Sequence, residues 1–137
     1  MQGFMERRVV SIDQPTADPS GDRPLDLTPE VQSWSVQMRK GVAELAVLGL
    51  LDDGARSGID IFNAFADNQA VSIAEGSIYP LLARLERDGR IMGAWEASGR
   101  GTRNLKVYQL TPQGRDHAAQ MKRFWHHMRE ELDNVTR

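Results

Sequence analysis

The chain has 137 residues, of which 40% are hydrophobic and 26% charged, and this composition is typical of one globular domain with an appendage. It has no cysteine, which excludes disulfide scaffolds, thiolate zinc sites and cysteine nucleophiles. No apolar run approaches the roughly 18 to 20 residues of a membrane span, and Glu6, Arg7 and Arg8 interrupt the start where a secretory signal would be apolar. We therefore expect a cytoplasmic protein without a membrane segment.

The formal net charge is −2, but the charges are unevenly distributed. Residues 1–33 and 34–83 each contain three basic and six acidic side chains, and residues 111–137 contain five and four. Only residues 84–110 are clearly basic, with six basic and three acidic side chains. A binding surface for a polyanion is therefore most plausible in this block.

Residues 1–30 are predicted to form a flexible, acidic, proline-containing arm. Within them, residues 13–29 contain four prolines together with Asp, Ser and Gly, and they show neither helical nor strand periodicity. Such a segment cannot bury enough apolar surface to offset its chain entropy. It is either a leader without a role of its own or a contact for a specific partner.

The first predicted helix runs from about Val31 to Asp53. Its apolar positions follow helical spacing, and the second half, VAELAVLGLL, is apolar nearly all round, which is typical of a helix inside a core. The spaced residues are Trp34, Met38, Val42, Leu45 and Leu48.

Two shorter helices are expected next. Ser57 is a plausible cap for a helix that ends near Asp67, and a third helix is predicted over residues 75–88, ending at Gly89. One side of this third helix is apolar through Ile78, Leu81, Leu82 and Leu85, while Gly76, Tyr79, Pro80, Ala83 and Arg87 lie opposite, with Ser77 and Arg84 on the flank. Pro80 implies either that Ser77 is the true N-cap or that the helix bends.

Residues 91–97 and 105–110 alternate in polarity and are predicted to pair as strands around the turn SGRGTRN. Thr111 and Pro112 then provide a cap and first position for a last helix that reaches about Val135. Its apolar residues follow the spacing of a coiled-coil seam. They are Ala118, Met121, Trp125, Met128, Leu132 and Val135.

The predicted order is three helices, a hairpin and a long helix, which indicates a mainly α winged helix-turn-helix domain over residues 31–111 with a C-terminal helix over 112–137. In such a fold the third helix enters the major groove and the wing lies along the DNA backbone. Ser77 and Tyr79 can donate hydrogen bonds to phosphates or base edges. Arg84, Arg100, Arg103 and Lys106 can neutralise phosphates, and the wing residues can also enter the minor groove.

The sequence also resembles the PadR family of bacterial transcriptional regulators over about residues 38–130. The matching stretches are RKGVAELAVLGLL, SGIDI, EGSIYPLLARLERDG, GRGTRNLKVYQLT and PQG, in the family's order, and the EGSIYPLL match is highly specific. The resemblance implies a homodimeric repressor of the short type, with a single C-terminal dimerisation helix. It maps DNA contacts onto Ser77, Tyr79, Arg84, Arg100, Arg103 and Lys106, and it adds Lys40 as a phosphate contact.

Two copies of the C-terminal seam could bury each other in a self-complementary dimer. The residues expected to form the dimer interface are Trp34, Met121, Trp125, Met128 and Leu132. In some relatives a tryptophan at the place of Trp125 stacks against planar aromatic compounds. The resemblance therefore implies that a small aromatic effector could bind here. A tryptophan in an apolar seam also fits a purely structural role.

Catalytic and metal-binding patterns are not found in the sequence. His126 and His127 are adjacent on a helix and point about 100° apart, so they cannot chelate one metal ion together. No phosphate-binding loop, nucleophile elbow or paired acid and base occurs. The expectation is a non-enzymatic, cofactor-free regulator that binds a pseudo-palindromic operator in double-stranded DNA and is released by a signal. The alternative is a winged-helix module that binds a protein without specific DNA binding.

Overall fold

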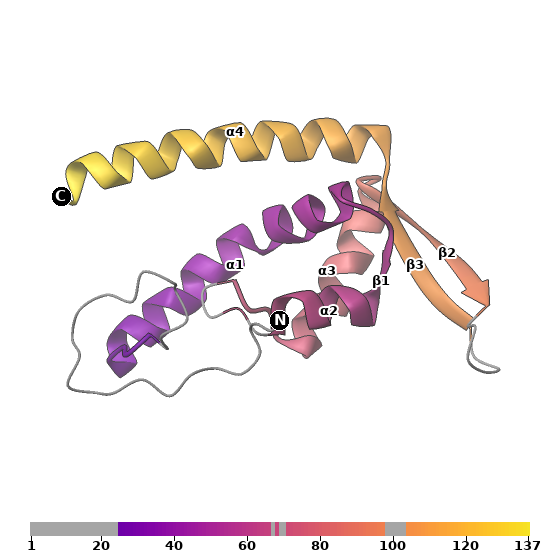
Figure 1. The fold of residues 1–137 in the computed structure, drawn as a ribbon, viewed down its shortest axis with the longest axis horizontal. Coiled ribbons are helices and arrows are strands. Elements are labelled where there is room, and N and C mark those ends of the chain that lie inside the picture. Colours follow the sequence, from indigo (N-terminus) through magenta and orange to yellow (C-terminus); the bar gives the residue numbers. More distant parts are fainter. Residues whose placement is uncertain (1–24, 67, 69–70, 98–103) are drawn as a thin grey trace.

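The computed structural model describes residues 25–66, 68, 71–97 and 104–137. Within these residues the chain forms four helices and a small antiparallel sheet (Figure 1). The elements are α1 (Pro29–Asp52), β1 (Arg56–Ser57), α2 (Gly58–Ala66), α3 (Glu75–Arg87), β2 (Ile91–Ala97), β3 (Asn104–Leu110) and α4 (Pro112–Val135). The expected mainly α architecture with a wing is confirmed, while most of the predicted arm, residues 1–24, lies outside the described residues.

Hydroxyl caps fix the starts of three helices. The amide of Asp60 donates to Ser57 Oγ at 3.2 Å, and the amide of Gly114 donates to Thr111 Oγ1 at 2.9 Å, which confirms both caps expected from sequence. The first helix begins at Pro29, slightly earlier than expected, because Thr28 Oγ1 accepts from the amide of Val31 at 3.3 Å and Pro29 fits the first turn. The helix therefore starts inside the segment assigned to the arm.

Helix α3 begins at Glu75, before Ser77. Its N-cap, Ala74, has no side chain that can accept a hydrogen bond, and Pro80 lies inside the helix. Of the two sequence-based alternatives, a start at Ser77 is therefore wrong. The helix ends as expected, because Gly89 adopts a φ of 78°, a left-handed conformation that favours glycine.

The sheet contains one strand more than the predicted hairpin, and its strand order is β1-β3-β2. Strand β2 pairs with β3 from Ile91↔Leu110 to Ala97↔Asn104. The short strand β1 pairs with the other edge of β3, through Arg56↔Tyr108. This pairing ties the start of α2 to the wing.

The core lies between the second half of α1, the inner face of α3 and the root of the sheet. Val47, Leu48, Ile61, Ile78, Leu82 and Leu85 have no solvent exposure. Burial of such side chains contributes about 25 cal/mol per Å² of apolar surface removed from water. Helix α3 is therefore held rigidly by one face while its other face remains free.

Helix α4 leaves the sheet and runs back along α1 in the opposite direction (Figure 1). Ala118 and Met121 pack against the core, whereas the far half of α4 extends beyond it. In the part of the chain that the structure describes, no helix is long and apolar enough to cross a membrane.

Candidate nucleic-acid interface

The exposed side of α3 carries side chains that differ in size and polarity. Ser77, Tyr79, Pro80 and Ala83 are exposed, while Ile78 and Leu82 on the opposite side are fully buried. Because the apolar face fixes the helix, these exposed side chains are presented in a defined orientation. A helix with one rigid exposed face is the element that a winged-helix protein inserts into the major groove.

Tyr79 lies across the start of α2. A Cβ atom added to Gly58 would come within 2.6 Å of Tyr79 Cε1, so the absence of a side chain at this position leaves room for the ring. The residue is nevertheless 46% exposed. Gly58 thus lets Tyr79 rest on α2 and still face solvent.

The base of the wing contains a cation surrounded by rings. Lys106 Nζ lies 3.0 Å from Glu86 Oε1, 5.9 Å from the ring centre of Trp95 and 5.5 Å from that of Tyr108. The hydrogen bond to Glu86 raises the pKa of Lys106, and burial raises the pKa of Tyr108. The charge of Lys106 is therefore paired within the chain.

Arg84 points toward α1. Its Nη1 donates to Glu44 Oε1 at 3.2 Å, and its side chain is 45% exposed. The predicted DNA contacts thus separate into Ser77 and Tyr79, which are exposed, and Arg84 and Lys106, which each pair with a carboxylate. Lys40 is exposed on α1, and the predicted wing-tip contacts Arg100 and Arg103 lie outside the described residues.

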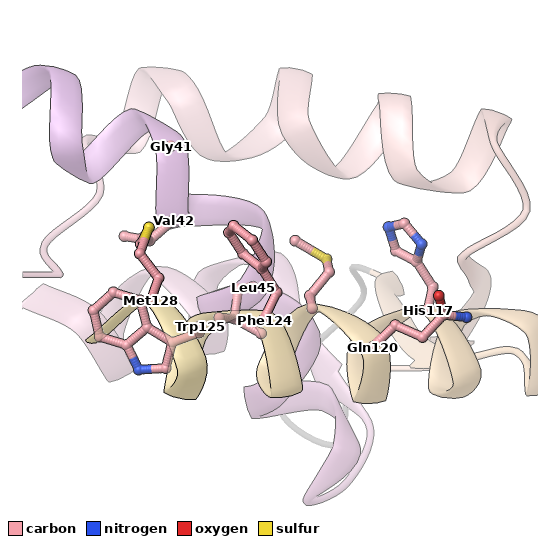
Figure 2. A pocket seen from close by; sticks show the side chains of 9 residues that line it. Gly41, Val42, Leu45, His117, Gln120, Phe124, Trp125 and Met128 are labelled. Atoms are coloured by element: carbon pink, nitrogen blue, oxygen red, sulfur yellow. The ribbon is translucent and has the colours of Figure 1, made fainter. Parts of the chain in front are cut away.

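A groove of about 360 Å³ separates α1 from α4. It is lined by Gly41, Val42 and Leu45 from α1 and by His117, Gln120, Met121, Phe124, Trp125 and Met128 from α4. Figure 2 shows the side chains of Phe124 and Met128 projecting from α4 toward α1. The groove therefore includes three of the five residues predicted for dimerisation.

The faces next to the groove carry large exposed apolar side chains. Trp34 is 61% exposed and Leu132 is 44% exposed. Met121 differs from them, because it also packs against the core of its own chain. Exposed apolar surface of this kind is typical of a protein interface.

Sequence reasoning missed Phe124 and Glu44. Phe124, which is 65% exposed, lies one position before the seam residue Trp125 and therefore does not follow the heptad spacing. Glu44 is the single charged residue in the apolar run of residues 41–51, and that isolation could have marked it as a residue with a specific partner.

Comparison with known proteins places this architecture in a family. Residues 47–120 match the model of the transcriptional regulator PadR-like family. A search of curated proteins finds no match.

Solved structures of PadR-type regulators share the fold. A PadR family regulator from Eggerthella lenta is 24% identical with a TM-score of 0.68, over 77% of this chain and 91% of that one. A PadR-like regulator from Bacillus cereus is 28% identical with a TM-score of 0.66, over 72% of this chain and 95% of that one. Bacillus subtilis PadR in complex with operator DNA is 33% identical with a TM-score of 0.55, over 58% of this chain and 46% of that one. The chain belongs to the PadR-like family of transcriptional regulators.

Proposed function

We propose that this chain is a sequence-specific DNA-binding repressor that acts as a homodimer on a pseudo-palindromic operator. The observation that carries the proposal is the exposed face of α3, which includes Ser77 and Tyr79 and is held rigidly by a buried opposite face. The family assignment and the relative that was solved with operator DNA support it. The proposed action is binding, with no catalytic step.

In this proposal α3 reads the major groove through Ser77 and Tyr79. Arg100 and Arg103 at the wing and Lys40 on α1 contact phosphates, which position the protein and make its affinity depend on salt. Arg84 and Lys106 remain predicted contacts, but each would have to exchange a carboxylate partner for a phosphate. Residues 31–111 form the DNA-binding unit and residues 112–137 the dimerisation helix.

The proposed dimer buries the exposed apolar faces of α1 and α4. Trp34, Trp125, Met128 and Leu132 would lie in the interface, and Phe124 joins them because it is large, apolar and exposed on the same helix. Met121 would link this interface to the core of its own chain. Two-fold symmetry of the protein then matches two half-sites on DNA.

Release from DNA is proposed to follow a signal that changes the relative orientation of the two recognition helices. Trp125 lines the groove between α1 and α4 and could stack a small aromatic effector there. A transcriptional regulator works where the DNA is, so a cytoplasmic location is part of the proposal.

The test is a titration of the full chain with duplexes from its own promoter region and with a scrambled duplex, at several salt concentrations. We expect tighter binding to one promoter duplex and a logarithmic salt slope of about 0.9 for each phosphate neutralised. Tyr79→Ala should weaken this specific binding at least about tenfold, or about 1.4 kcal/mol, while leaving binding to the scrambled duplex nearly unchanged.

Two further variants separate the contribution of the Tyr79 ring position from that of its hydroxyl. Tyr79→Phe keeps the ring on Gly58 and removes the hydroxyl, whereas Gly58→Ala displaces the ring and keeps the hydroxyl. If both variants weaken specific binding while the unfolding temperature stays unchanged, then the position of the ring and the hydrogen bond of the hydroxyl each contribute to binding. Equal affinity for all duplexes, or no effect of Tyr79→Ala, would contradict the proposal and favour the protein-binding module.

A further inference from the structure

The carboxylate of Glu44 lies where three helices meet. Arg84 on α3 donates from Nη1 to Glu44 Oε1 at 3.2 Å, and His117 on α4 lies with Nε2 3.1 Å from Oε2. A carboxylate can only accept hydrogen bonds, so the proton between His117 and Glu44 belongs to the imidazole nitrogen. One side chain on α1 therefore holds α3 with one oxygen and α4 with the other.

This arrangement links α3 and α4 at a second place, away from the junction where Thr111 meets Gly89 and Arg90 at the end of α3. Among the described residues, the most extensive contacts of α4 are with α1, and those of α3 are with α2 and β2. The Glu44 side chain is 21% exposed, compared with 45% for Arg84. A half-buried, charged hydrogen bond is stronger than an ion pair in open solvent.

We propose that Glu44 is a positioning residue that couples the orientation of α4 to that of the recognition helix α3. This inference rests on the proposed function, since it concerns how operator binding responds to the C-terminal helix. Glu44 contacts no DNA in this scheme. It fixes the side of α3 that carries Arg84, and it makes that position depend on His117, which also lines the groove between α1 and α4.

The chemistry of the side chain makes Glu44→Gln the most informative variant. Glutamine has nearly the same shape but no charge, and its amide nitrogen can meet His117 Nε2 only if the imidazole changes tautomer to accept. The charge-assisted connections to Arg84 and His117 are therefore weakened while the packing of α1 is kept. An opposite result follows if Arg84 binds DNA directly, because the variant would free its guanidinium and binding would stay unchanged or tighten.

A second ion pair between α1 and α4 provides the matched control. Arg115 in the first turn of α4 pairs with Asp52 in the last turn of α1, and α3 takes no part in this contact. Asp52→Asn therefore weakens an attachment of α4 to α1 without touching the recognition helix. It distinguishes general loosening of α4 from loss of the specific coupling.

The experiment measures operator affinity of the full chain by fluorescence anisotropy, with thermal unfolding recorded for each variant. Glu44→Gln should weaken binding about fivefold or more, as expected for coupling between sites, and Asp52→Asn should change it less than about twofold. Arg84→Gln and His117→Ala should have non-additive effects when combined, and the same pair should become additive in the Glu44→Gln background.

Each other outcome overturns the inference. Unchanged or tighter binding by Glu44→Gln, equal effects of Glu44→Gln and Asp52→Asn, or additive effects of Arg84→Gln and His117→Ala would show that Glu44 does not couple the helices. These results leave the proposed function intact, because the unmodified chain still prefers its operator. Failure of the unmodified chain to prefer any promoter duplex would overturn the proposed function and the inference together.

Discussion

The two halves of α1 lie in different environments. In the second half Val47 and Leu48 have no exposure and belong to the hydrophobic core. In the first half Trp34 is 61% exposed, and near the middle of the helix Gly41, Val42 and Leu45 line the groove toward α4. One continuous helix thus passes from a core that the chain itself completes to an apolar surface that the described residues leave exposed.

The difference shows that hydrophobicity and burial must be treated separately. Trp34 and Leu48 are both large and apolar, yet only Leu48 has neighbours from the same chain on all sides. Exposed apolar surface of this size has a cost in water unless another molecule covers it. The closed half therefore accounts for folding, and the open half is the part that we propose is buried in the dimer.

The largest expected effect separates the two halves by stability. Leu48→Ala removes a fully buried side chain and leaves a cavity, so the free energy of unfolding should fall by about 2 to 5 kcal/mol. Leu132→Ala, at a position that is 44% exposed, should change the stability of the separate chain by no more than about 0.5 kcal/mol. Urea titrations monitored by circular dichroism measure both values.

Protein concentration sharpens this comparison. In a dimer that uses α4, the cost of Leu132→Ala should depend on protein concentration, because the lost contact is between chains. The loss of stability caused by Leu48→Ala should not depend on protein concentration. Equal and concentration-independent losses at both positions would remove the distinction between the two regions.

An intermediate effect is expected on association. Phe124→Asp places a charge on an exposed apolar face and should raise the dissociation constant of the dimer at least about tenfold, equivalent to about 1.4 kcal/mol. Sedimentation equilibrium measures the constant, and circular dichroism checks that helix content is kept.

Tyr79→Asp is the control for this change, because Tyr79 is also a partly exposed aromatic residue but lies on α3. It should leave dimerisation unchanged. If Phe124→Asp and Tyr79→Asp have the same effect, or if neither has any, the assignment of the α4 face to assembly is wrong.

The smallest expected effect concerns glycine in the helices. An added Cβ at Gly49 would meet nothing within 4 Å, so Gly49→Ala should raise the free energy of unfolding by about 0.5 to 1 kcal/mol. Gly114→Ala should instead lower it, since the new Cβ would collide with the carbonyl of Arg90. Thermal unfolding of the two variants gives the signs, and a stabilised Gly114→Ala would contradict the packing at the start of α4.

The local parts of the fold could be predicted from sequence. Ser57 and Thr111 were recognised as caps because hydroxyl caps depend on residues within one turn. Strand β1 was missed, since two residues are too few to show alternation and its partner Tyr108 is distant in sequence.

The candidate site shows the same division. The exposure of Tyr79 follows from helical periodicity, which the sequence displays. The carboxylate partners of Arg84 and Lys106 are 40 and 20 residues away, and such pairs depend on how elements pack together. The predicted DNA contacts Ser77, Tyr79, Arg84 and Lys106 therefore stay predictions, with a different structural setting for each pair.

The junction between α3 and α4 has a geometric consequence for operator spacing. Thr111 Oγ1 donates to the carbonyl of Gly89, two residues after the end of α3, at 2.6 Å. The amide of Thr111 donates to the carbonyl of Arg90 at 3.1 Å. Gly114 lies against the same carbonyl of Arg90. The direction in which α4 leaves is thus set at the end of the recognition helix. In a dimer joined through α4, this short junction would set the distance between the two recognition helices. That distance must match the spacing of the half-sites, which on B-DNA is about 34 Å for one helical turn.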